Sequence, residues 1–201
     1  MSGILKVGGS ELINDNGGSG ALQWGSGVPA GTVIQTVIDS DATTYANTSF
    51  TSGPTNEIAL SKAYSITPTS SSNKILAHFT IPQVRLTINV AGLYIKIYRK
   101  IGSGSYAHLT EASGDNTGTP EGAFAGNYDR QGDGNRSSLW LGGVFSDTSH
   151  GQSGVEVSYK FYFGSGDGSS PGIYVNRTEN DNNANYNFRT RTHCTLQEIK
   201  G

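Results

Sequence analysis

The chain contains a single cysteine, a single methionine and few charged residues, which make up 15% of its 201 positions. Because Cys194 has no partner, no intrachain disulfide can form, and we do not expect a disulfide-stapled secreted module. We interpret Cys194 as a small core residue near the last strand. The formal net charge is −2, whereas duplex-binding proteins usually carry a basic surplus or stripe. We therefore expect no nucleic-acid partner.

Long apolar runs are also missing. Hydrophobic residues form only 34% of the chain, and no run approaches the roughly 20 residues that a membrane-spanning helix needs. The N-terminus lacks the basic-then-apolar layout of a secretory signal. We expect a soluble chain without membrane insertion or an export signal, and its length suits one β-sandwich or barrel.

Alternation of apolar and polar residues is the main pattern that is present. In Val155–Phe163, the residues at odd positions are apolar or aromatic and those at even positions are mostly polar. This period of two is typical of a half-buried β-strand. Similar segments recur between clusters of Gly, Ser, Asn and Asp, and no segment of comparable length shows a helical stripe. The pattern indicates an all-β domain.

Eight to ten strands follow at intervals of about ten residues, which predicts an antiparallel sandwich or barrel. Gly102–Ser105 is typical of a hairpin turn between two of them. The predicted strands are Thr32–Ile38, Ala59–Ile66, Lys74–Ile81, Val84–Val90, Leu93–Ile101, Tyr106–Leu109, Ser137–Phe145, Val155–Phe163, Gly172–Arg177 and Tyr186–Ile199.

The first 31 residues differ from the rest, so we divide the chain into an N-terminal arm (1–31) and a β-domain (32–201). The arm has short apolar patches separated by glycine-rich stretches, too short to form a core alone. We expect these patches to anchor the protein by adding strands to a larger partner; the alternative is an arm folded back onto its own domain. The anchoring residues would be Ile4, Leu5, Val7, Leu12, Ile13, Leu22 and Trp24.

Three segments carry a resemblance to a known family. Ser2–Leu12 resembles the opening of many jelly-roll structural and fibre proteins of tailed bacteriophages, especially marine ones. Ile66–Leu76 resembles their polar turn followed by a Lys-Ile-Leu strand, and Thr192–Gly201 resembles their terminal strand. The resemblance implies a jelly roll of the tumour-necrosis-factor or C1q type, often trimeric, on a virion appendage. It supplies no catalytic residues.

Two groups of surface residues are candidates for binding. An outward Tyr/Lys face suits a subunit contact, unless a second sheet or a crossing loop covers it; its members are Tyr94, Lys96, Tyr98 and Tyr162. Tyrosines beside amide, carboxylate and guanidinium groups suit glycan binding, although such composition is also ordinary for loops. These candidates are Tyr106, Tyr128, Asp129, Arg130, Tyr174 and Arg177.

No constellation indicates catalysis or a cofactor. The carboxylates Glu111, Asp115 and Glu121 could serve glycoside hydrolysis only at separations that the sequence does not define. Asp129–Asn135 alternates oxygen ligands with glycine, but it lacks the distal glutamate and the flanking helices of an EF-hand. We expect no enzyme activity, no resident metal and no cofactor, with a calcium-binding loop left as an alternative.

The leading hypothesis is therefore a non-enzymatic virion structural protein: a trimeric fibre or appendage subunit, on the tail or the head, held to other virion proteins through its N-terminal arm. The first alternative is a receptor-binding module for a host surface glycan. A capsid decoration protein and a polysaccharide depolymerase are further alternatives. The position on the particle, the receptor and the oligomer number stay open at this point.

Overall fold

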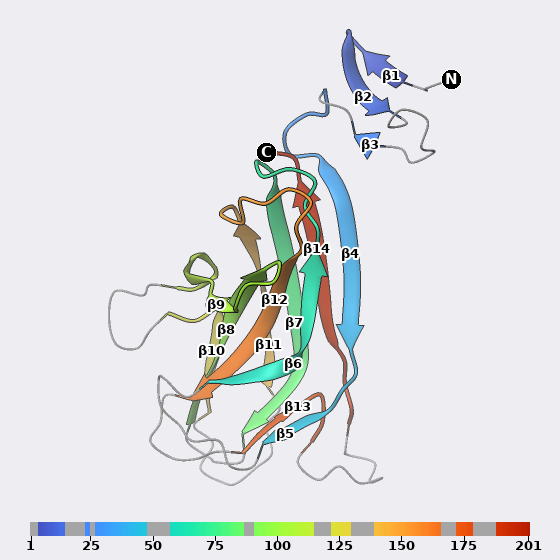
Figure 1. Cartoon of the computed structure of the whole chain (residues 1–201). Helices are drawn as coiled ribbons and strands as arrows, with labels where there is room; N and C mark the ends of the chain where they lie inside the picture. The colour runs from blue at the N-terminus through green and yellow to red at the C-terminus, as the bar shows by residue number, and fades with distance from the viewer. Residues whose placement is uncertain are drawn as a thin grey trace.

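The computed structural model describes residues 4–14, 23–24, 27–47, 57–86, 91–114, 122–129, 139–165, 172–178 and 188–201. These residues form β-strands joined by turns, with one short 3₁₀ turn at Thr110–Ala112 and no α-helix in the described ranges. Two packed sheets make the body of the protein, and a small third sheet lies at one end (Figure 1).

The first sheet of the body, here called the β7 sheet, is organised around its longest strand. β7 pairs with β11 along one edge. Along its other edge it pairs first with β14 and then with β13. β4 pairs with β14, and β5 pairs with β13. Its strands are β4 (Val33–Asp41), β5 (Tyr45–Asn47), β7 (Lys74–Leu86), β11 (Leu139–Asp147), β13 (Ile173–Val175) and β14 (Thr192–Ile199).

The second sheet, here called the β8 sheet, runs in the order β10-β8-β12-β6, with β9 also paired to β8. All its pairs are antiparallel. Its strands are β6 (Ile58–Ile66), β8 (Ala91–Ile101), β9 (Ala107–His108), β10 (Ala125–Asp129) and β12 (Val157–Ser165).

Strand pairing defines the fold as a jelly roll. The eight main strands pair from the outside of the sequence inward: β4 with β14, β6 with β12, β7 with β11, and β8 with β10. This is the pattern of one long antiparallel ribbon rolled into two facing sheets. The predicted fold class, an antiparallel jelly-roll sandwich, is confirmed.

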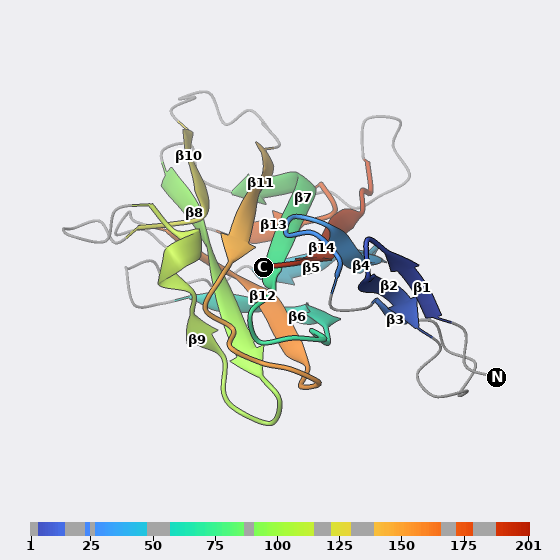
Figure 2. The same cartoon turned by 90° about the horizontal axis from the view of Figure 1, so that it is seen from above.

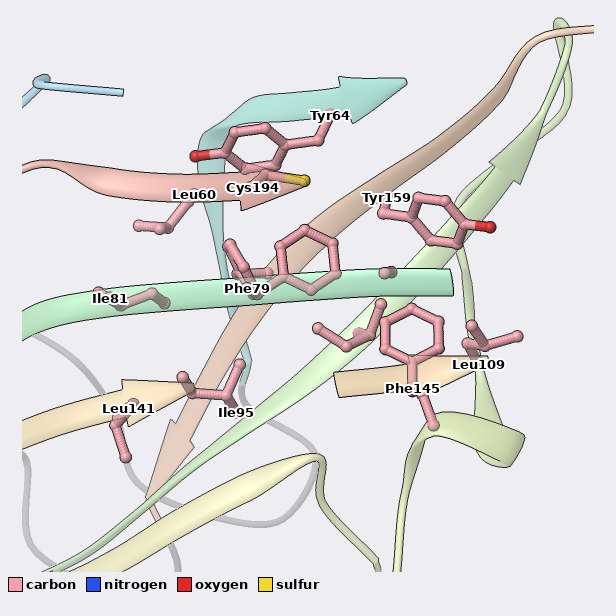
Figure 3. Packing of buried hydrophobic residues seen from close by; sticks show 14 of the residues in the cluster. Leu60, Tyr64, Phe79, Ile81, Ile95, Leu109, Leu141, Phe145, Tyr159 and Cys194 are labelled. Atoms are coloured by element: carbon pink, nitrogen blue, oxygen red, sulfur yellow. The ribbon is translucent and has the colours of Figure 1, made fainter. Parts of the chain in front are cut away.

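The core lies between the two sheets and is rich in aromatic rings (Figure 3). Phe79, on β7, is 1% exposed. Its ring meets that of Phe161 from the facing sheet edge-on at 4.7 Å and stacks with that of Phe145 at 5.9 Å. Offset and edge-to-face contacts of this kind add to the free energy that burial contributes. Cys194 is buried beside this cluster, as predicted.

The course of β7 differs from the prediction of two separate strands, Lys74–Ile81 and Val84–Val90. One strand continues through Pro82 to Leu86, and residues 87–90 lie outside the described ranges. Leu141 faces Ile81 but Leu139 faces Val84, so β7 has one extra residue at this point. Such a bulge accommodates proline in a strand and reverses the alternation, which explains the apparent break in the sequence.

The start of β12 also differs from the prediction. We expected Val155 to be the first inward residue, but the strand begins at Val157, and Val155 is 37% exposed. Gly154, with a φ of +69°, lies in the turn before it. The four remaining inward positions, Val157 to Phe163, are buried as expected.

The third sheet contains β1 (Ile4–Val7), β2 (Ser10–Asn14) and β3 (Gln23–Trp24). Gly8 and Gly9 form the two-residue β1–β2 turn, and both have positive φ, as the primed hairpin turns require. Thus the apolar patches pair with one another rather than remaining separate. The sheet projects beyond the end of the sandwich where the C-terminus lies (Figure 1). The division at residue 31 remains a prediction.

Candidate functional surfaces

The N-terminal sheet exposes apolar side chains. Ile4, Leu5 and Trp24 are 48%, 54% and 47% exposed, while Leu12 and Ile13 are half-buried. The Trp24 indole N–H donates to the Ile34 carbonyl at 2.9 Å, which ties the sheet to the start of β4. The anchoring role of these residues stays a prediction; Val7 is placed in β1, and Leu22 lies outside the described residues.

The outer face of the β8 sheet contains the four predicted subunit-contact residues, and one of them is excluded. Lys96 is 2% exposed, and its ammonium lies 2.8 Å from the carboxylate of Glu57 in the same chain. The Tyr98 hydroxyl donates to that carboxylate at 2.6 Å. Because Glu57 covers it from within the chain, Lys96 cannot contact a second subunit. Tyr94, Tyr98 and Tyr162 remain partly exposed and stay candidates.

Aromatic rings form a column across three strands of this face. The rings of Tyr98 on β8 and Tyr162 on β12 stack at 3.8 Å. On the other side of β8, the His108 ring on β9 stacks with the Tyr98 ring at 5.6 Å. The ring of Tyr94, farther along β8, lies 5.4 Å from the Lys96 ammonium. Tyr98, Tyr162 and His108 therefore form one continuous aromatic group on this face, and Tyr94 contacts Lys96 instead of another ring of the group.

At the end of this surface, two lysines converge on one tyrosine. The ammonium groups of Lys100 and Lys160 lie 5.5 and 5.0 Å from the centroid of the Tyr106 ring. The β8–β9 hairpin holds Tyr106 in place, and its turn begins at Gly102, which has a φ of +52°. The Gly102 N–H donates to the Glu156 carbonyl at 2.8 Å and closes the hairpin against the start of β12.

The six predicted glycan-binding residues do not form one site. Tyr128 pairs with Gly92 near the start of β8, whereas Tyr106 precedes Ala107, which pairs with Arg99 near the end of the same strand. The seven residue steps from Gly92 to Arg99 extend for roughly 23 Å, so one sugar unit cannot contact both tyrosines. Asp129 ends β10 beside Tyr128, and Arg130 lies outside the described residues.

Tyr174 is a further correction, since it is only 7% exposed in the middle of β13. The Arg177 guanidinium lies 5.4 Å from its ring, and the Arg177 Nε–H donates to the Thr178 carbonyl at 2.9 Å. A buried ring cannot stack on a sugar. Tyr106, which is half-exposed, is therefore the glycan candidate with an accessible ring and defined neighbours.

The outer face of the β7 sheet is a surface that sequence reasoning missed. One row across its four strands reads Val144, His78, Thr195 and Ile38. Ile38 is 77% exposed and Val144 is 57% exposed. Trp140, on the same strand as Val144, is 61% exposed. The available signal was the apolar residue on the outward side of β4 and of β11, Ile38 and Val144.

Buried polar groups around Asp147, the last residue of β11, form hydrogen bonds that stabilise the fold. Asp147, fully buried, accepts hydrogen bonds from Arg99 at 2.6 Å and from the Tyr159 hydroxyl at 2.7 Å. Burial alone would raise its pKa, but these bonds hold the pKa below the usual value. Arg99 also lies 3.4 Å from Glu111, one of the three carboxylates considered for hydrolysis; Asp115 and Glu121 lie outside the described residues.

A cavity of about 200 Å³ lies beside Arg99 and the β8–β9 hairpin. Its one guanidinium group, on Arg99, is already paired with Asp147 and Glu111, so it is not available to an anionic ligand. Apart from His108, which bonds to Ser113, its remaining lining is small or apolar: Ile101, Gly104, Ser105, Ala107 and Leu109.

Metal and thiol chemistry find no support in the described part of the chain. No group of three or more His, Cys, Asp or Glu side chains there is placed to hold a metal ion. Burial raises the pKa of the Cys194 thiol, so it stays protonated. Asp133 and Asn135 of the possible calcium loop lie outside the described ranges. Nor does any helix in those ranges have the length and apolarity to cross a membrane.

Comparison with known proteins assigns no family, since no family model and no curated protein matches the chain. Among solved structures, a chain in the structure of infectious bursal disease virus, Gt strain, is similar over 90% of this chain with 12% identity and a TM-score of 0.41. A chain of the Gx strain is similar over 84% with 11% identity and a TM-score of 0.39. This protein spans about two fifths of their length, 41% and 40% respectively.

Proposed function

We propose that this protein is a non-enzymatic virion structural protein, a fibre or appendage subunit attached to its particle through the N-terminal sheet. The observation that carries the proposal is the exposure of Ile4, Leu5 and Trp24 on a sheet that projects from the sandwich. Burying them against a partner would contribute about 2 kcal/mol for each side chain. An edge strand such as β1 can also accept a further strand from that partner.

The positions of the N-terminal sheet and of β5 and β13 at opposite ends of the sandwich support attachment by one end. The N-terminal sheet lies at the end of the sandwich where β14 finishes, whereas β5 and β13 lie toward the opposite end (Figure 1). Anchoring through the N-terminal sheet would therefore direct that opposite end away from the particle.

The trimer is the second element of the proposal, and the outer face of the β7 sheet supports self-association. The central row contains no Lys, Arg, Asp or Glu side chain, so these residues bring no pair of like-charged carboxylates, ammonium or guanidinium groups together when two copies approach. Ile38 and Val144 supply exposed apolar area there, which suits the centre of a subunit contact. Tyr94, Tyr98 and Tyr162 on the other sheet remain the alternative contact.

Two measurements test the parts separately. Light scattering coupled to size exclusion should give three times the monomer mass for the full chain; a monomer at micromolar concentration contradicts the trimer. Immunogold labelling of virus particles that carry the protein should find it on an appendage. The triple substitution Ile4→Ser, Leu5→Ser and Trp24→Ser should abolish labelling while leaving the oligomer intact; unchanged labelling contradicts the anchoring role.

A receptor-binding module for a host surface glycan is the second candidate, favoured by Tyr106 with its two lysines. The two functions are compatible on one appendage, with anchoring at the N-terminal sheet and binding on the sandwich. Binding of the purified chain to a glycan array supports the second candidate; absence of binding leaves only the first.

A further inference from the structure

We propose that Lys100, Tyr106 and Lys160 form a binding site for an acidic saccharide, whose carboxylate or sulfate group lies between the two ammonium groups. The proposal deepens the receptor-binding candidate and rests on it. Both ammonium groups lie within 5.5 Å of the centroid of one ring, so a short saccharide that packs against this ring can reach both. They come from adjacent strands, which makes their separation a property of the sheet.

Charge balance distinguishes these lysines from the neighbouring ones. Lys62 is paired with Asp39 at 2.7 Å and Lys96 with Glu57 at 2.8 Å. Among the described residues, Lys100 and Lys160 form no ion pair, and both ammonium groups lie over the Tyr106 ring. Two cations that share one aromatic ring repel each other, and a bound anion removes that repulsion.

One carboxylate faces the site. Glu156 accepts a hydrogen bond from the Ser158 hydroxyl at 2.9 Å, and its charge contributes to raising the pKa of Tyr106. Two ammonium groups and one carboxylate leave a net positive charge. The Glu156 carboxylate therefore repels a bound anion and weakens its binding, and neutralising this carboxylate should tighten binding.

Aromatic groups beside the lysines favour a sugar over a small inorganic anion. Burial is the main cause that raises the pKa of the Tyr106 hydroxyl, and the same holds for Tyr162, so both stay neutral near pH 7 and can donate hydrogen bonds. The stacked rings of Tyr98 and Tyr162 continue from the lysines along the face. Rings pack against the C–H faces of sugars while hydroxyl groups bind their polar edges.

The small number of cations argues against other polyanions. Nucleic-acid binding draws its free energy from neutralising many phosphates, and this site offers two lysines on a chain of net charge −2. Attraction to an anionic membrane adds only about 1 kcal/mol for each basic residue. A short acidic glycan needs no more than two cations.

The site is compatible with attachment through the N-terminal sheet. Viewed along the sandwich, β8 and β9 lie on the side away from β1, β2 and β3 (Figure 2). A particle contact at the N-terminal sheet would therefore leave the β8–β9 hairpin accessible to a ligand.

The experiment measures binding of the full chain to immobilised polysialic acid and chondroitin sulfate, with dextran as the neutral polymer. We expect binding to both acidic polymers, none to dextran, and weakening as salt rises. The double variant Lys100→Gln, Lys160→Gln should bind at least tenfold more weakly, and Glu156→Gln more tightly. The matched control is Lys74→Gln, an exposed lysine at the start of β7, which should leave binding unchanged.

The outcomes that overturn the proposal are separable. Equal binding by the double variant, or equal binding to dextran, removes the site while leaving a receptor role elsewhere on the molecule. Equal binding to oligothymidylate or to phosphatidylserine vesicles shows a general polyanion surface and also overturns it. No binding to any glycan removes both the site and the receptor-binding candidate, whereas the anchoring proposal is tested independently by particle labelling. Circular dichroism of the double variant confirms that the fold is intact.

Discussion

Glu57 and Lys96 form an ion pair of 2.8 Å in which the two side chains are only 8% and 3% exposed. The pair lies on the outer face of a sheet, where the sequence pattern indicates solvent. Glu57 stands immediately before β6, and Lys96 stands in the middle of β8. A segment far away in the sequence thus converts an outward lysine into a buried one.

The first prediction concerns this pair. Lys96→Met should lower the free energy of unfolding by about 3–5 kcal/mol, because it leaves the Glu57 carboxylate buried without its cation. Adding Glu57→Gln should recover part of the loss. Urea denaturation monitored by fluorescence measures both.

The control for this variant is Lys62→Met, since the Lys62–Asp39 pair is 36% and 37% exposed. Exposed pairs contribute at most about 1 kcal/mol, so this substitution should change stability little. A loss for Lys96→Met no larger than for Lys62→Met would contradict the buried-pair interpretation.

The second prediction concerns the aromatic core. Phe79→Ala should cost about 3–5 kcal/mol, since it opens a cavity among rings that cannot close around it. Phe188, which is 62% exposed, provides the matched control, and Phe188→Ala should be close to neutral. Thermal or chemical denaturation of both variants distinguishes a central ring from a peripheral one.

The third prediction concerns acid stability. Glu198 is fully buried and accepts hydrogen bonds from Asn73 at 2.6 Å, Gln35 at 2.6 Å and the Thr69 N–H at 2.7 Å. Burial would raise its pKa, but these bonds hold the pKa below the usual value of 4.5. The folded state therefore gains stability above that value and loses it as the pH falls through the folded-state pKa.

Melting temperatures measured from pH 7 to pH 3 check the sign. The wild type should lose stability below about pH 4.5, and Glu198→Gln should be less stable at pH 7 but show a shallower decline in acid. The pKa of Asp147 is also lowered, so the Glu198→Gln variant should still lose some stability in acid. An identical acid dependence in the two proteins would show that Glu198 does not contribute to it.

The fourth prediction concerns a close approach between strands. A Cβ atom at Gly142 would lie 2.5 Å from the Phe79 carbonyl and 3.2 Å from the Thr80 Cα, and neither backbone can move without disturbing the β7–β11 pairing. Gly142→Ala should therefore cost roughly 1–3 kcal/mol. Gly114→Ala is the control, because its nearest atom would be 3.9 Å away; equal effects would contradict the steric argument.

Part of the fold was predictable because it depends on local periodicity. Residues that alternate along β8 and β12, such as Ile95, Ile97, Phe161 and Phe163, are buried as their spacing predicted. The break at Pro82 was misleading, because a bulge and the end of a strand both interrupt the alternation of apolar and polar residues. Only the pairing of β7 with β11 distinguishes the two.

The candidate sites were harder to predict, because a site is defined by what lies beside a residue rather than along the chain. Tyr106 was identified from its loop neighbours, but the lysines that converge on it come from β8 and β12. Tyr174 had the same kind of sequence context and is buried. The exposed row at Ile38 and Val144 became visible only through the register of four strands.

Local alternation was enough to specify the strand content and the inward residues of most strands, because side chains alternate with a period of two whatever the strand packs against. The tertiary structure decided the jelly-roll pairing, the covering of Lys96 and the convergence of Lys100 and Lys160. Those features depend on contacts between segments distant in sequence, and such contacts are set by which strands become neighbours.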